Sequence, residues 1–152
     1  MDDIKLTKNI TEYKRASVAL AETVADHVKK INKRMGELKL VDMTITTAGL
    51  ERLTLIRQLV CANAGREWIL GWDLGEGDCR DISEPYDPDK LGTSFYLYGD
   101  YNCEITRGTI SDYLLAAKNM RALYAELDRL TEEKTREVQE GLNLLAEIEL
   151  KA

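Results

Sequence analysis

His27 is the only histidine in this chain of 152 residues, and its surroundings limit the chemistry that it can do. It lies beside Val28, at the edge of an apolar stripe with helical spacing. A hydrolytic triad needs a histidine beside a nucleophile, and a zinc site needs several His or Cys ligands at short spacing. The serines stand in no Gly-x-Ser-x-Gly sequence, and the cysteines form no Cys-x-x-Cys pair. We therefore expect His27 to be a partly buried structural residue, and we predict no catalytic residue and no metal site.

The glycine-rich segment 71–78 has to be compared with two kinds of ligand-binding loop. It contains neither Gly-x-Gly-x-x-Gly nor Gly-Lys-Ser/Thr, and its carboxylates would repel a phosphate. Counted as a calcium loop from Asp73, it has Gly75 and Gly77 at two ligand positions and Asp78 where a glycine is required. A solvated hairpin turn explains the segment better, and we expect no cofactor.

Residues 67–108 combine aromatic and acidic side chains, which is a composition typical of a binding surface. They include seven of the ten aromatic residues, and ten acidic residues against three basic ones. Aromatic side chains often anchor protein interfaces. In a strand, Tyr96 and Tyr98 would point to one face and Phe95 to the other, which leaves one face for a partner. The predicted binding residues are Trp72, Tyr86, Tyr96, Tyr98, Tyr101, Asp78, Asp81, Asp87, Arg80 and Arg107.

A long amphipathic helix is predicted on the N-terminal side of this insert. Between residues 10 and 38, apolar residues recur every three or four positions, and charged residues fill the other face. Asn9 and Thr11 are candidates for its N-cap. A second period at residues 47–64 predicts a shorter helix, which Gly65 would end. Its cap would be Thr46 or Thr47.

The C-terminal segment 109–150 carries the strongest pattern, a coiled-coil-like apolar stripe at alternating threes and fours. Thr109 can form a capping box with Asp112. Thr131 and Lys134 weaken the stripe and Gly141 lowers helix propensity, so two helices with a break near Thr131 are an open alternative to one continuous helix. Such a helix is longer than a domain of this size needs, and we expect a second copy to cover its surplus apolar surface.

Alternating apolar residues predict short strands within 67–106. Residues 68–74 form the clearest strand pattern, 79–82 would return as a hairpin arm, and 93–98 and 102–106 are further candidates. The expected fold is α+β and mainly α. Long terminal helices pack antiparallel, and a small antiparallel sheet is inserted between them.

Size and charge narrow the remaining classes. At 17.2 kDa and 44% hydrophobic residues, the chain fits a single domain spanning 1–152. No apolar run approaches the ~20 residues of a membrane-spanning helix. The N-terminus lacks a signal-peptide core, and the three cysteines suit reduced thiols, so we expect a cytoplasmic protein. The net charge of −6 disfavours direct binding to nucleic acid.

These observations favour a non-enzymatic protein-interaction module. It would form a homodimer through its helices and present the acidic, aromatic insert to a protein partner with a basic surface. An inhibitor of a basic nucleic-acid-binding host protein, encoded by a phage or other mobile element, would fit this charge and size.

Two alternatives remain open at this stage. The first is a module that binds a nucleotide or sugar, in which Trp or Tyr stacks on the ligand and Arg66, Arg80 or Arg107 meets an anion. The second is an enzyme built on carboxylates, whose positions the sequence does not fix. A different interpretation of the aromatic residues is that all of them fill the core of the small sheet.

Overall fold

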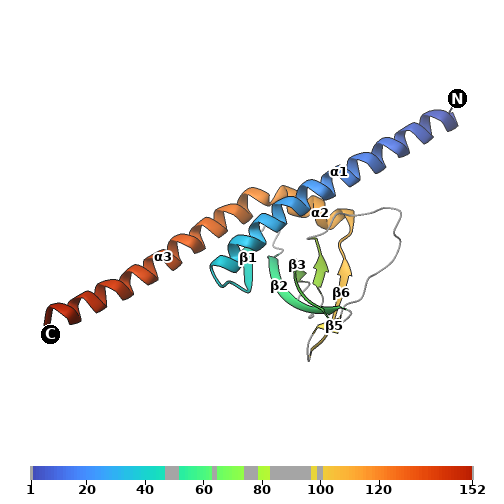
Figure 1. The fold of residues 1–152 in the computed structure, drawn as a ribbon. Coiled ribbons are helices and arrows are strands. Elements are labelled where there is room, and N and C mark those ends of the chain that lie inside the picture. Colours follow the sequence, from blue (N-terminus) through green and yellow to red (C-terminus); the bar gives the residue numbers. More distant parts are fainter. Residues whose placement is uncertain are drawn as a thin grey trace.

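The computed structural model describes residues 2–46, 52–62, 65–73, 79–82, 97–98 and 101–151. Its main elements are the helices α1 (Asp2–Glu37), α2 (Ile110–Lys118) and α3 (Met120–Lys151), with a sheet inserted between α1 and α2 (Figure 1). The expected fold class, α+β and mainly α, is confirmed. Within these residues, no helix combines the length and the apolar character that crossing a membrane would require.

Helix α1 begins eight residues earlier than expected. It starts at Asp2, so Asn9 and Thr11 lie inside it and cap nothing. The Thr11 hydroxyl instead donates to the carbonyl of Thr7 at 2.9 Å, a bond that the helical backbone offers to any interior threonine. The exposed first turns are rich in charged residues, and such residues maintain a helix without an apolar stripe.

The C-terminus of α1 turns sharply into the sheet. Lys39 has φ 61°, in the left-handed region, and is followed by a hydrogen bond from the Leu40 amide to the carbonyl of Met35 at 2.9 Å. The Lys39 amide bonds to the carbonyl of Gly36 at 3.2 Å. This pair of bonds is the Schellman arrangement, which satisfies the last carbonyls of a helix.

Among the described residues, the sheet contains six strands in the order β1-β2-β3-β4-β6-β5, and β5 also pairs with β2. The strands are β1 (Asp42–Thr46), β2 (Arg52–Ala62), β3 (Gly65–Asp73), β4 (Cys79–Asp81), β5 (Leu97–Tyr98) and β6 (Tyr101–Arg107). Because β5 pairs with β2, five of these strands form a closed ring in the order β2-β3-β4-β6-β5. All pairs are antiparallel except β4 with β6, which is parallel, so the sheet is mixed rather than antiparallel throughout.

The helix predicted at residues 47–64 is wrong, because β2 occupies most of that segment. Thr46 ends β1 and Gly65 begins β3, so neither acts as a helix cap or stop. The apolar residues of this run satisfy a helical period and a strand period equally well. Pairing decides between them, since β2 is hydrogen-bonded to β1 over its first half and to β3 over most of its length.

The strand predictions at 68–74, 79–82 and 102–106 are confirmed as β3, β4 and β6. The hairpin between the first two is confirmed by the antiparallel pairing of β3 with β4. Of the strand expected at 93–98, only β5 lies within the described residues.

The core lies between one face of α1, the sheet, and the start of the C-terminal helices. Its largest fully buried side chains come from all three parts: Val28, Ile31, Met35, Met43, Leu55, Ile82, Tyr113, Leu123 and Leu127. The sequence period had placed the α1 members of this set on the apolar face.

Helices α1 and α3 run in the same direction where they overlap, and not antiparallel as expected. His27 meets Tyr124 and Arg34 meets Asp128, so residue numbers rise together along both helices. The chain returns through the sheet and α2 and thus enters α3 near the middle of α1. As a result, the N-terminal part of α1 and the C-terminal part of α3 extend to opposite ends of the molecule (Figure 1).

The C-terminal helical segment is interrupted at Asn119 and not near Thr131. The Asn119 side-chain amide donates to the carbonyl of Leu115 at 2.9 Å, and its backbone has φ −111° and ψ 11°. A side chain that bonds the backbone in this way competes with helix continuation. Thr131 lies inside α3, where its hydroxyl donates to the carbonyl of Leu127 at 2.7 Å.

Candidate interaction surface

The apolar stripe of α3 is buried in its first half and bare in its second. Leu123 and Leu127 are fully buried against the core. Farther along the helix, five large apolar side chains, Leu144 among them, are between 56% and 66% exposed, and four of these continue the spacing of the stripe: Val138, Leu142, Leu145 and Ile148. We call residues 131–151 the α3 tail and these four side chains the tail face.

The tail face continues the same side of α3 that the core covers. At about 100° per residue, Leu127, Leu142 and Leu145 lie within roughly 40° of the direction of Val138. Residues 132–140 of the tail are all exposed, so the cover ends near Thr131. The core therefore covers the apolar face of α3 along its first half only. This continuity distinguishes the tail from a surface on which single apolar residues are scattered.

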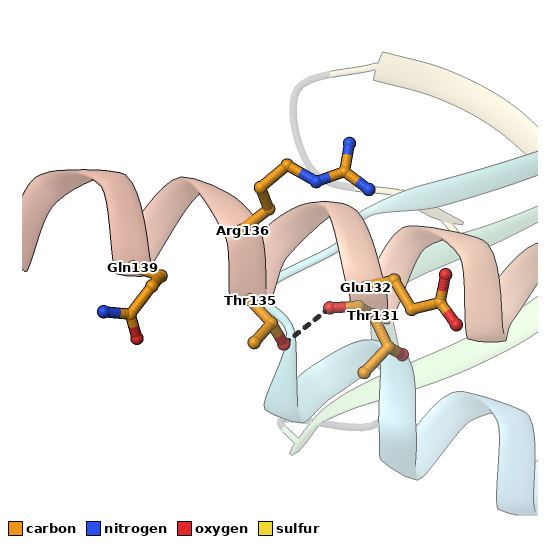
Figure 2. Close-up of a pocket in the computed structure, with 5 residues that line it drawn as sticks. All are labelled: Thr131, Glu132, Thr135, Arg136 and Gln139. Atoms are coloured by element: carbon orange, nitrogen blue, oxygen red, sulfur yellow. Dashed lines mark hydrogen bonds between the residues drawn. The ribbon is translucent and has the colours of Figure 1, made fainter.

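A shallow, open groove of about 500 Å³ marks the boundary between the two halves. Its lining within the described residues is Thr131, Glu132, Thr135, Arg136 and Gln139, all on α3 (Figure 2). The hydroxyls of Thr131 and Thr135 donate to carbonyls of their own helix, at 2.7 and 2.8 Å. Both threonines are thus satisfied and can offer their methyl groups to an apolar neighbour.

The other end of the molecule has a smaller bare surface. Ile10 and Tyr13 of α1 are 49% and 61% exposed, although the same stripe of α1 is buried from Ala21 onward. This overhang carries fewer large apolar side chains than the α3 tail.

The contact between α1 and α3 is polar at its margin. His27 Nδ1 and the Tyr124 hydroxyl share a hydrogen bond of 2.8 Å, and the two rings meet edge to face at 82°. Burial raises the pKa of Tyr124 above its usual 10.0, and the nearby Arg34 opposes this effect. Arg34 itself is paired with Asp128 at 2.9 Å.

We expect Tyr124→Phe to cost about 0.5 to 1.5 kcal/mol of stability near neutral pH, because it removes the hydrogen bond to His27. The pH dependence should also change. A raised pKa means that the folded state favours the neutral phenol, so its contribution is complete below pH 10 and is lost as the pH rises through the folded pKa. Urea unfolding on either side of pH 10 should therefore show a larger loss in the wild type than in Tyr124→Phe.

The exposed Tyr13 provides the matched control for this measurement. Tyr13→Phe should leave the stability near neutral pH unchanged. Equal stabilities of Tyr124→Phe and the wild type at both pH values would show that the contact contributes nothing.

Charged side chains along α3 pair mainly within the helix. Arg129 binds Glu126 at 2.6 Å and Glu133 at 2.9 Å, and Lys134 lies 3.8 Å from Glu137. The hydrogen bond from Arg129 is the main reason why the pKa of Glu126 is lowered. These exposed pairs contribute little to stability, but they fix the charge pattern beside the tail face.

Arg80, a predicted binding residue, has a structural partner. Its guanidinium lies 3.1 Å from the buried carboxylate of Asp112, at the N-terminus of α2. Asp112 also accepts hydrogen bonds from the amide and the hydroxyl of Thr109, which confirms the predicted cap of this helix. Arg80 thus pairs with a carboxylate at the start of α2, and this carboxylate competes with any anionic ligand for the guanidinium.

Strand pairing brings five further predicted residues to neighbouring register positions. Trp72 pairs with Arg80 between β3 and β4, Asp81 pairs with Arg107 between β4 and β6, and Tyr98 pairs with Tyr101 between β5 and β6. The other four predicted residues lie outside the described part of the chain: Tyr86, Tyr96, Asp78 and Asp87.

Sequence reasoning identified the apolar stripe of residues 109–150 but not where its cover ends. It also missed the pair of Arg80 and Asp112, because nothing local connects residues so far apart. Among the residues that the structure describes, no cluster of three or more His, Cys, Asp or Glu side chains could hold a metal ion. Comparison with protein families, curated proteins and solved structures finds no significant match to this chain.

Proposed function

We propose that this chain is a non-enzymatic interaction protein that assembles through its helices and presents its sheet insert to a protein partner. The observation that carries the proposal is the stripe of α3, buried at Leu127 and bare at Val138, Leu142 and Leu145. A contiguous apolar face that ends in solvent is the usual mark of a protein contact.

The insert is the proposed surface for a second protein. Register pairing puts Tyr98 beside Tyr101 and Asp81 beside Arg107, so aromatic and charged residues gather on adjacent strands. Residues 67–108 carry ten acidic and three basic side chains, which favours a partner with a basic surface. An inhibitor of a basic nucleic-acid-binding protein remains the kind of function that we propose for it.

The double variant Tyr98→Ala/Tyr101→Ala tests the insert. The immobilised wild-type chain should retain basic proteins from a cell lysate at low salt, and the captured amount should fall steeply as salt is added. The double variant should retain at least roughly tenfold less, because interface energy is concentrated in few aromatic anchors. Circular dichroism should show unchanged helicity.

Tyr13→Ala is the matched control, since it removes an exposed tyrosine far from the insert in sequence. It should capture as much as the wild type. Capture that is equal for the insert variant and the wild type, or that is independent of salt, would contradict the role of the insert.

A further inference from the structure

We propose that the α3 tail binds the α3 tail of a second copy, antiparallel, through the tail face. This inference deepens the proposed function and rests on it, because it names the partner of the bare helix face. The two copies would be related by a twofold axis that passes between Gly141 and Leu142. Such a contact is self-complementary and closes at two copies.

The tail face is continuous with an interface that the protein already has. The face that α1 and β1 cover at Leu123 and Leu127 continues without a change of direction into Val138, Leu142 and Leu145. A single helix cannot bury its own apolar face, and an isolated helix of this length is only marginally stable in water. The tail needs another helix on this face for the same reason that the first half of α3 does.

The tail face is complementary in charge to a second, antiparallel copy of itself. When two tails are antiparallel about the point between residues 141 and 142, Lys134 is level with Glu149 of the second copy. Both side chains lie within about 40° of the direction of Val138, so they face the second copy, and the pair of opposite charges occurs twice by symmetry.

A parallel pairing in register lacks this complementarity. It places Lys134 and Glu149 each beside its own copy, and like charges that face each other across a helix interface are unfavourable. Lys134 and Glu149 are the informative residues, because both lie on the apolar face and interrupt it. Only the antiparallel arrangement makes them partners.

The apolar side chains of two antiparallel tails also fit each other. The same alignment brings Val138 level with Leu145 of the second copy, and Gly141 level with Leu142. A side chain added at Gly141 would meet nothing within 4 Å, so the space beside this glycine is open to the facing leucine. The last two turns of the second copy come level with the groove at Thr131 and Thr135, whose methyl groups can receive them.

The shape of the molecule permits this arrangement. The tail projects away from the sheet and from α1, and the C-terminal end of α3 lies at one end of the molecule (Figure 1). Two tails of about 30 Å can overlap along their length while the two sheets stay at opposite ends of the pair.

Sedimentation equilibrium of the full chain tests the partner. The wild type should be a dimer at micromolar concentration, and Leu142→Glu/Leu145→Glu should raise the dimer dissociation constant by roughly a hundredfold or more. Leu114→Glu is the matched control, because Leu114 is an exposed leucine on α2 and should leave the dimer intact. If the tail variant unfolds at the same denaturant concentration as the wild type, the rest of the protein still folds.

Charge reversal tests the direction. Lys134→Glu and Glu149→Lys should each weaken the dimer roughly tenfold, and the double reversal should restore it. In a parallel dimer each residue faces its own copy, so the single reversals would change little and the double reversal would restore nothing. That result overturns the antiparallel assignment.

The outcomes separate this inference from the proposed function. A monomeric wild type whose tail face is needed to capture a different protein overturns the second copy as partner but keeps the interaction function. A dimer that ignores Leu142→Glu/Leu145→Glu overturns the tail as its interface. A monomer that binds nothing through its tail or insert overturns both.

Discussion

Leu127→Ala is expected to lower the free energy of unfolding by about 2 to 5 kcal/mol. Leu127 is 0% exposed and packs where α3 crosses the core of α1 and the sheet. Removing most of a fully buried leucine loses its burial and leaves a cavity that rigid neighbours cannot fill. Urea denaturation followed by circular dichroism at 222 nm measures the change, since both long helices report at this wavelength.

Leu150→Ala is the control for this prediction, because Leu150 lies on the same helix and is 89% exposed. Its effect should stay within about 0.5 kcal/mol. Similar effects of the two substitutions would mean that the first half of α3 does not pack on the core.

Asp112→Ala should cost about 2 to 4 kcal/mol, because one carboxylate satisfies two different needs. It accepts the amide of Thr109 at 2.7 Å at the start of α2, and it lies 3.1 Å from the guanidinium of Arg80 on β4. The alanine variant leaves the guanidinium on β4 without its carboxylate and the Thr109 amide without its acceptor. Urea denaturation near neutral pH measures the loss.

Asp112→Asn separates the two contributions. Asparagine keeps an oxygen that can accept the Thr109 amide, but it has no charge for Arg80. Its cost should fall between the wild type and the alanine variant. If asparagine and alanine are equally destabilising, the ion pair dominates, and if alanine equals the wild type, the carboxylate is dispensable.

The helices could be predicted from the sequence because their information is local. The apolar period of α1 identifies its buried face, and Thr109 with Asp112 identifies the start of α2. The period at residues 52–62 misled because Leu53, Ile56 and Val60 follow helical spacing, whereas Leu53, Leu55 and Leu59 follow the alternation of a strand. Pairing with β1 and β3 decided the outcome, and such pairing depends on residues distant in sequence.

The interruption of the C-terminal segment shows a finer limit. Thr131 weakens the apolar stripe, yet a threonine inside a helix can bond its hydroxyl to the preceding turn, as this one does. Asn119 gives no signal in the stripe, but its side chain bonds Leu115 and ends α2. The direction of α1 against α3 could not be derived, because it depends on where the chain leaves the sheet.

The candidate site was predictable only in outline. The surplus apolar stripe of residues 109–150 was visible in the sequence, whereas the point where its cover ends requires the position of α1. For the insert, strand parity suggested a binding face. The role of Arg80 emerged only once β4 was placed beside α2.

The left-handed backbone at Lys39 lies in the turn that connects α1 to the sheet. A lysine with φ 61° gives up some of the stability that glycine would keep at this position. The turn at this residue directs the chain from the axis of α1 toward the first strand, and the shared core then holds the helix against the sheet. Because glycine adopts this backbone conformation without strain, its place in the turn would be compatible with the same path of the chain.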